Sequence, residues 1–278
     1  MRYPRSALVA VLALVSVPTA WGQPQAELVL HFVEIGQGDC TLIECPNGGF
    51  ILVDAGSTAR GDRDAVRDYV RDQLDQANPR IDTVVVTHPD ADHYNYLPDV
   101  LKDDIKVGQI LLVEGNDDYE VPGGDFDGWM QDHPGVPIFR LDEDDNDPAN
   151  DPSDICDCGD VDVFVLAANV GGSNAPRNDR SIVLMLSYGE FDVVLTGDAT
   201  KATEDAIIEE YDKDDWLGVE VLKVGHHGSV TTSTSSRWAK VTHLPESNPL
   251  HNDSRAERVR PPDGPICKAM IAKWLSTA

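Results

Sequence analysis

The stretch that decides the fold is Thr87–Leu97, which reads T-H-P-D-A-D-H-Y-N-Y-L. It follows the apolar, β-branched run 81–86, which predicts a buried strand and places the stretch on the loop at that strand's C-terminal end. Four metal-ligand side chains fall within it: His88, Asp90, Asp92 and His93. Carboxylates this close repel each other unless a cation lies between them, and mixed nitrogen and oxygen ligation suits zinc or a similar first-row metal. We therefore prefer a metal site to a solvated polar loop.

Two later segments repeat the pattern of a strand followed by ligand residues. The run 191–196 precedes Gly197-Asp198-Ala199, and the run 219–224 precedes Gly225-His226-His227-Gly228. The glycines allow the backbone to turn sharply after each strand. Taken alone, Asp198 could be the N-cap of a following helix and the two histidines a polar turn. Three such strand ends in one chain instead predict that they meet in a single metal centre.

The order of these motifs resembles that of the metallo-β-lactamase superfamily. T-H-x-D-x-D-H, T-G-D-A and K-V-G-H-H-G-S follow one another as in the hydrolase domain of ComEC-type DNA-uptake proteins and their free-standing secreted relatives. Three further segments resemble that subgroup's V-G-Q-G-D, D-A-G and N-x-x-S-x-V-L motifs: His31–Asp39, Leu52–Gly56 and Asn178–Leu184. The resemblance covers about residues 27–236 and implies a hydrolase domain with an α/β fold, the αββα sandwich of two sheets between layers of helices.

Hydrophobic patterning gives elements that fit such a sandwich. Strands are expected near 27–35, 40–45, 50–53, 82–86, 109–113, 161–166, 181–188, 191–196 and 219–224. Helices are expected near 62–76, 94–101 and 200–211. The segment 115–160 is rich in Gly, Pro, Asp and Asn and is expected to form excursions beside the active site.

The resemblance also implies roles for individual residues. It places His88 and Asp90 at a first metal, Asp92 and His93 at a second, and Asp198 as a bridge between them. Besides binding metal, Asp90 and Asp198 are expected to take part in catalysis.

The histidine pair completes the implied ligand set. His226 is favoured as the last ligand of the second metal, with His227 as its alternative and as a further catalytic residue. Asn178 lies in about the region where the family often has a third histidine for the first metal. Asp39 and Asp54 are expected to orient the ligands without binding metal themselves.

The expected cofactors are two divalent ions, zinc with manganese as the alternative. Such ions turn a bound water into a nucleophile near neutral pH and accept negative charge on a carbonyl or phosphoryl oxygen. A phosphodiesterase or nuclease is favoured by the ComEC-like motifs. A hydrolase of lactones, β-lactams or other small esters and amides is favoured by the acidic surface. A non-catalytic metal-binding exported protein is the third reading, because the third histidine is absent and the tail departs from the family pattern.

Length and charge narrow the possible partners. The 278 residues suffice for one large domain, and the net charge of −27 opposes tight nonspecific binding to nucleic acid. The expected partner is thus a small-molecule or phosphodiester substrate. Acid is concentrated in 142–160, where a solvated loop is preferred to a calcium site because the EF-hand glycine is missing.

The N-terminus resembles a secretory signal peptide. Arg2 and Arg5 precede the apolar run 7–17, and the small residues Ala20 and Gly22 precede an expected cleavage near Gln23. Residues 1–22 are therefore expected to be removed, leaving a secreted or periplasmic protein without a membrane span.

An exported protein can form disulfides, and four cysteines lie within the family-like region: Cys40, Cys45, Cys156 and Cys158. Two bridges are expected between the first pair and the second pair, with zinc binding or simple burial as alternatives. Cys267 is left over. It lies in the tail 237–278, which departs from the family pattern and could leave one sheet without its last strand.

Overall fold

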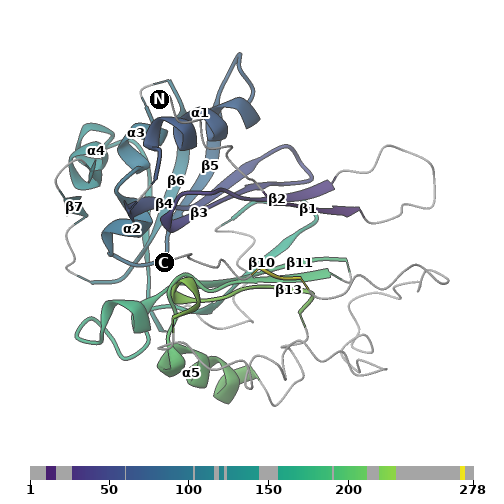
Figure 1. Cartoon of the computed structure of the whole chain (residues 1–278), viewed down its shortest axis with the longest axis vertical. Helices are drawn as coiled ribbons and strands as arrows, with labels where there is room; N and C mark the ends of the chain where they lie inside the picture. The colour runs from purple at the N-terminus through teal and green to yellow at the C-terminus, as the bar shows by residue number, and fades with distance from the viewer. Residues whose placement is uncertain are drawn as a thin grey trace, which may run out of the picture.

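The computed structural model describes residues 11–16, 27–59, 61–102, 104–115, 119–121, 124–143, 156–189, 191–211, 219–229 and 270–272. These residues form two larger sheets that face each other, with helices on both outer sides (Figure 1). The expected α/β sandwich of four layers is confirmed. The expected cleavage point near Gln23, the acidic residues 144–155, Cys267 and most of the tail 237–278 lie outside the described residues.

The first sheet has seven strands and carries the ligand loop. Its strands in spatial order are β1 (Val11–Ser16), β2 (Glu27–Phe32), β3 (Gln37–Glu44), β4 (Phe50–Ala59), β5 (Arg80–Val86), β6 (Lys106–Val113) and β9 (Ile138–Leu141). β1 to β4 pair antiparallel, whereas β4, β5, β6 and β9 run parallel. The C-terminal ends of these parallel strands therefore lie at one edge, where β5 delivers the loop that starts at Thr87.

Helices cover the outer face of this sheet. They are α1 (Arg63–Gln73), α2 (Ala91–Tyr94), α3 (Leu97–Val100) and α4 (Phe126–Asp132). In α1, Asp62 caps the first turn by accepting a hydrogen bond from the Ala65 amide. Val66 and Val70, one turn apart, face inward and join the apolar cluster between helices and sheet.

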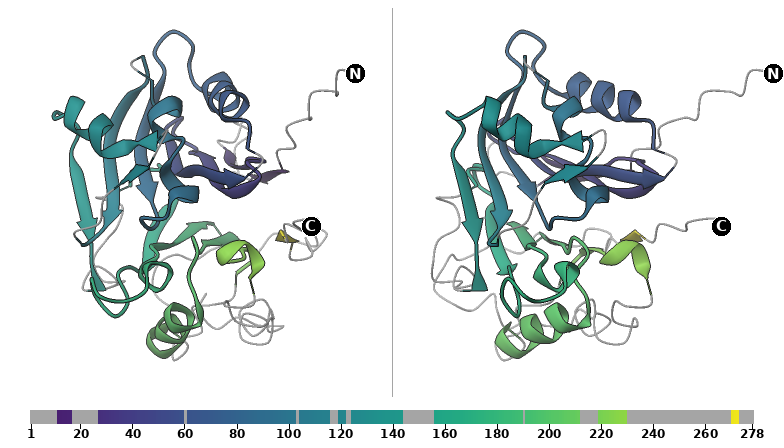
Figure 2. Two further views of the ribbon diagram at one scale, coloured as in Figure 1. Left: turned by 60° about the vertical axis from the view of Figure 1, so that its left-hand side comes forward. Right: turned by 90° about the vertical axis from the view of Figure 1, so that its left-hand side faces the viewer.

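The second sheet has five strands and carries the other two turns. Its strands in spatial order are β10 (Asp162–Ala167), β11 (Val183–Tyr188), β12 (Phe191–Leu195), β13 (Val221–Lys223) and β14 (Met270–Ala272). β13 and β14 run parallel to β12, so β12 and β13 end at the same edge. α5 (Lys201–Tyr211) packs on the outer face through its own apolar cluster (Figure 2). β14 shows that a strand from the tail does close this sheet.

The main core lies between the sheets and includes a disulfide. Buried residues of β2 to β6 pack there against residues of β10 to β13. Cys45, just after β3, is bonded to Cys158, just before β10, with an S–S distance of 2.03 Å. One of the two expected bridges is thus present.

The second expected bridge was wrong, because Cys40 and Cys156 are both buried free thiols. Cys40 points into the cluster under the helices, whereas Cys156 lies in the core between the sheets. The first sheet separates the two thiols, so they cannot pair.

Two segments contain more regular structure than expected. The segment 115–160 contains α4, β9 and a small hairpin of β7 (Glu120–Val121) and β8 (Gly124–Asp125). The stretch expected as a signal peptide contains β1. Among the described residues, no helix is both long and apolar enough to cross a membrane.

Candidate metal centre

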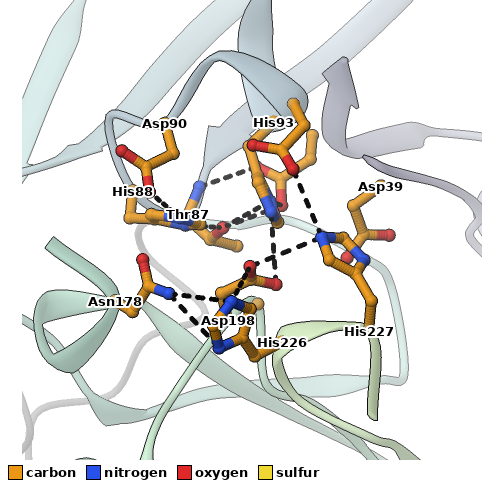
Figure 3. A network of polar contacts seen from close by, with 12 residues as sticks. Asp39, Thr87, His88, Asp90, His93, Asn178, Asp198, His226 and His227 are labelled. Atoms are coloured by element: carbon orange, nitrogen blue, oxygen red, sulfur yellow. Dashed lines mark hydrogen bonds and ion pairs between the residues drawn. The ribbon is translucent and has the colours of Figure 1, made fainter. Parts of the chain in front are cut away.

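The three expected ligand segments meet at one end of the sandwich, between the two sheets. Figure 3 shows His88, Asp90 and His93 of the first sheet's loop facing Asp198, His226 and His227 of the second sheet's turns. The structure therefore brings together the sequence-predicted residues, which lie far apart in the chain.

Asp54, in the middle of β4, fixes the first sheet's loop. Its carboxylate accepts hydrogen bonds from the Thr87 amide and the Thr87 hydroxyl, each at 2.8 Å, and lies 2.7 Å from His93 Nδ1. Asp54 is fully buried and has a left-handed backbone with φ of 58°, which aims the carboxylate at the loop. His93 Nε2 is thereby turned toward Asp198, 3.2 Å from its Oδ1. The expected orienting role of Asp54 matches these contacts.

Gly56 explains why the loop can sit so close to β4. A Cβ on Gly56 would lie 2.6 Å from the Tyr94 amide nitrogen and 2.7 Å from the Ala91 carbonyl oxygen, both in α2. Only a glycine allows α2, which carries Asp92 and His93, to pack directly on the strand.

Asp90 precedes α2 and lies at the rim of the site. Its side chain makes no capping bond, and its two oxygens lie 3.6 Å from His88 Nε2 and 3.2 Å from the Arg177 guanidinium. His88 is fully buried, whereas the Arg177 side chain is 54% exposed. Arg177 opens the short helix Arg177–Arg180, which also presents Asn178 to His226 at 3.4 Å. The sequence analysis did not single out Arg177.

Asp198 lies centrally, on a turn locked to the first sheet. Gly197 before it has φ of 51°, and a Cβ there would lie 2.8 Å from the Thr87 side chain. The Asp198 amide donates to the Ser181 hydroxyl at 3.3 Å. The Asp198 carboxylate is therefore held between the two halves of the site.

The two adjacent histidines occupy different places. His227 Nε2 lies 3.5 Å from Asp92 Oδ2 and 3.4 Å from Asp198 Oδ2. His226 Nε2 is 4.0 Å from Asp198 Oδ2, on the side of Asn178 (Figure 3). Both residues have left-handed backbones, with φ of 47° and 50°. The structure thus brings His227, and not His226, to the acid expected at the second metal.

The residues present fit a metal. The potential ligand atoms of His88, His93 and Asp198 lie within 4.8 Å of one another, as do those of Asp92, His93 and His227. Four inward-facing atoms are buried and have no hydrogen-bond partner within the described part of the chain: His88 Nε2, His93 Nε2, His227 Nε2 and Asp198 Oδ1. Buried polar atoms are rarely left without a partner, and bound divalent cations would supply a partner for all four atoms.

The electrostatics point the same way. The nearby His88 imidazole and, more weakly, the Arg177 guanidinium lower the pKa of Asp90 to about 2, against the opposing effect of burial. Burial alone would raise the pKa of Asp198, but His93 and His88 hold it far below its usual range. Burial likewise opposes a charge on His93, yet the carboxylates of Asp198 and Asp54 raise its pKa. Asp90 and Asp198 are therefore ionised at neutral pH, and a metal would displace the proton that His93 otherwise keeps.

The comparisons agree with this geometry. The model of the family described as the metallo-beta-lactamase superfamily matches residues 33–239. The chain belongs to this superfamily. It is also similar to ComE operon protein 3 of Bacillus subtilis (strain 168), with 24% identity over 212 residues, which are 72% of this chain and 25% of that protein. The resemblance expected from the motifs is confirmed, although the chain spans only about a quarter of that relative's length.

Two solved structures align with part of this chain. CmlA, a diiron β-hydroxylase from Streptomyces venezuelae, aligns with a TM-score of 0.43 and 16% identity, over 73% of this chain and 35% of that one. A protein of Parabacteroides distasonis ATCC 8503, described as a metal-dependent hydrolase, aligns with a TM-score of 0.42 and 17% identity, over 83% and 82% of the two chains.

Proposed function

We propose that this chain is an exported hydrolase that uses two divalent metal ions, zinc with manganese as the alternative, on phosphodiester or nucleic-acid-type substrates. The observation that carries the proposal is the pair of overlapping ligand groups, with four buried atoms that have no other described hydrogen-bond partner. Membership of the superfamily supports a hydrolase in general, and the ComEC-like motifs of the sequence favour the narrower substrate class.

The ligands divide between the two ions as follows. His93 can serve only one ion, because Asp54 holds its Nδ1 and leaves Nε2. We assign His93 to the second ion together with Asp92 and His227, because the ligand atoms of these three residues lie within 4.8 Å of one another.

The first ion then falls to His88 and Asp90, which face each other at 3.6 Å. Asp198 would bridge the ions, because its ligand atom lies within 4.8 Å of that of His88 and its Oδ2 lies 3.4 Å from His227 Nε2. The bound ions would supply an activated water and stabilise the negative charge that develops on the substrate.

Two side chains outside the ligand set support an anionic substrate. Arg177 is half exposed beside Asp90, and Asn178 lies beside His226. Both can donate hydrogen bonds to a non-bridging phosphoryl oxygen, and a guanidinium binds such oxygens well. In a chain of net charge −27, a local cation at the rim favours a short phosphodiester over a long polyanion.

A substrate panel tests the proposal. Zinc-loaded and manganese-loaded protein is offered bis-p-nitrophenyl phosphate, single-stranded DNA, a lactone and nitrocefin, with chelator-treated protein as the control. We expect hydrolysis of a phosphodiester that chelation abolishes. Turnover of only the lactone or nitrocefin would replace the substrate class, and metal binding without any turnover would favour a non-catalytic binding protein.

Export is the second part of the proposal. The Cys45–Cys158 disulfide supports an oxidising compartment, and the charged and apolar N-terminus supports a signal peptide. N-terminal sequencing of protein recovered outside the cytoplasm should begin near Gln23. An intact Met1 in a cytosolic fraction would contradict export and leave the metal chemistry untouched.

A further inference from the structure

Lys223 is a buried cation beside the metal centre that the ligand set does not use. It is the last residue of β13, in the second sheet, and its ammonium forms an ion pair with Asp39 of β3, in the first sheet. The two side chains are only 13% and 8% exposed. Removing a lysine and an aspartate from water is costly, so such a pair adds little net stability, whereas breaking it leaves a buried charge without compensation.

The pair joins the two sheets next to the ligands of the second ion. The carboxylate of Asp39 lies within 4.8 Å of the ligand atoms of Asp54 and His93. In Figure 3, Asp39 lies on the same side of the site as His227, opposite Asp90 and Asn178. The contact therefore holds the sheets together where Asp92 and His93 must meet His227.

Lys223 is also tied to both turns of the second sheet. Its ammonium donates to the Gly197 carbonyl at 3.4 Å, beside Asp198, and its own carbonyl accepts from the Thr196 hydroxyl at 2.7 Å. The His226 amide donates to the same Gly197 carbonyl at 3.4 Å. The ion pair that holds Lys223 to the first sheet thus also holds the turn of Asp198 and the histidine turn close to that sheet.

The opposite side of the site has its own link between the sheets. There the Ile182 amide donates to the Thr87 carbonyl at 2.9 Å. The far end of the sandwich is joined by the Cys45–Cys158 disulfide. On the His227 side, the Lys223–Asp39 pair is the corresponding link between the sheets.

We propose that Lys223 is a positioning residue of the metal centre, which binds Asp39 across the two sheets and so sets the distance between the His227–Asp198 turns and the Asp92–His93 loop. The proposal rests on the proposed metal centre. Its experiment therefore measures metal binding rather than hydrolysis, so that the two can fail separately.

The sharpest variant is Lys223→Met combined with Asp39→Asn. It removes a positive and a negative charge together, so it keeps the local charge balance and loses only the link. Zinc affinity is measured by competition with a chelating dye, and Co²⁺ spectra report the coordination. We expect zinc to bind about 10- to 100-fold more weakly, as for other residues that orient metal ligands, with an altered Co²⁺ spectrum. Lys223→Arg should restore most of the affinity, since a guanidinium keeps the charge and the donors.

A matched control removes a different ion pair. Arg63 and Asp99 join α1 to α3 at 2.7 Å on the outer helical layer, so Arg63→Met with Asp99→Asn should leave zinc affinity unchanged. Cooperative thermal unfolding of each metal-free variant confirms that it folds. If the Lys223 and Asp39 double variant does not fold, Lys223→Gln provides the same comparison with a smaller change.

Wild-type zinc affinity and Co²⁺ spectrum in the folded double variant, or in Lys223→Gln, would overturn the positioning role and would show that the pair only balances charge. Absence of zinc binding by the wild-type protein would instead overturn the metal centre and the proposed function with it.

Discussion

The loop after β5 and the turns after β12 and β13 supply the same kinds of ligand, but the protein holds them in different ways. His88 and His93 are completely buried, and Asp54 and Thr87 fix the loop through hydrogen bonds that need no metal. On the second sheet, His226 and His227 are 30% and 25% exposed and stand on left-handed backbone. Non-glycine residues occupy that region at a cost of about 1–2 kcal/mol each.

This difference indicates which half of the site holds its ligands in place before a metal binds. The first sheet presents a rigid half-site as part of its own core. The second sheet places its histidine ligands themselves on left-handed backbone, whereas in the first half the orienting residue Asp54 has this conformation; metal binding would offset the cost at the histidines. Stability and metal affinity should therefore respond differently to mutations in the two halves.

The largest effect is expected where the halves meet, at Asp198. Asp198→Ala removes the carboxylate that contacts His93 and His227, so both ions should bind about 100-fold more weakly or be lost. Elemental analysis after dialysis against zinc measures this, with Asp205→Ala on the exposed side of α5 as the control. Wild-type zinc content in Asp198→Ala would show that the two halves do not share a ligand.

The next effect tests whether the first half is preformed. Asp54→Ala would leave the buried Thr87 amide and His93 Nδ1 without their acceptor, and should lower the free energy of unfolding by about 3–5 kcal/mol. Urea denaturation in the presence of EDTA measures it without any contribution from metal. Asp54→Asn should recover part of the loss because its amide oxygen still accepts. A loss below about 1 kcal/mol for the alanine variant would mean that this half also depends on metal.

A somewhat smaller effect is expected at the far end of the sandwich. Replacing Cys45 and Cys158 with alanine should lower the free energy of unfolding by about 2–4 kcal/mol, since the bridge closes a loop with a sequence separation of 113. Urea denaturation again measures the change.

Peptide mapping without reductant should identify the Cys45–Cys158 pair and free thiols at Cys40 and Cys156. Burial raises the pKa of the Cys156 thiol to about 12, so alkylation of it should require unfolding. A Cys40–Cys156 bridge in the map would contradict the structure.

The smallest effect is expected at His227, where one mutation should raise the stability of the metal-free protein but lower its affinity for zinc. His227→Gly should raise the stability of the metal-free protein by about 1 kcal/mol, because glycine adopts the left-handed backbone without strain. The same change should weaken zinc binding by removing a ligand. His88→Gly, in the rigid half, should reduce both. If His227→Gly destabilises the metal-free protein, the second half is not strained in the way its backbone indicates.

Much of this centre was predictable from the sequence, because its ligands follow strands whose C-terminal ends can be predicted from apolar runs. The apolar runs before Thr87, Gly197 and Gly225 predicted three strands, and the polar residues after them predicted the three ligand segments. Both sheets and the longer helices followed from the same patterns. The Gly- and Asp-rich segment 115–160 was less informative, since α4 and β9 there are stabilised by tertiary packing rather than by a strong periodic pattern.

The placement of adjacent residues was harder to predict. His226 and His227 follow the same strand, and only the left-handed turn decides which of them reaches Asp92. The sequence did not indicate a role for Lys223, because the side chain of a lysine at a strand end is usually solvated.

The missed cysteine pairing, by contrast, could have been found. Cys40 and Cys45 are an odd number of residues apart along one strand, and alternation places such side chains on opposite faces of the sheet.

The disulfide's sequence separation of 113 has a consequence for how the protein is made. The first sheet leaves the ribosome with Cys45 and the complete His88–His93 loop well before Cys158, Asp198 or His227 exists. A nascent chain therefore carries an unpaired thiol and half of a metal site, and contacts this distant in sequence form slowly. Oxidation therefore cannot precede the synthesis of Cys158, and complete metal loading cannot precede the synthesis of His227. The disulfide and the loaded centre would thus mark, in that order, two successive stages in the making of the chain.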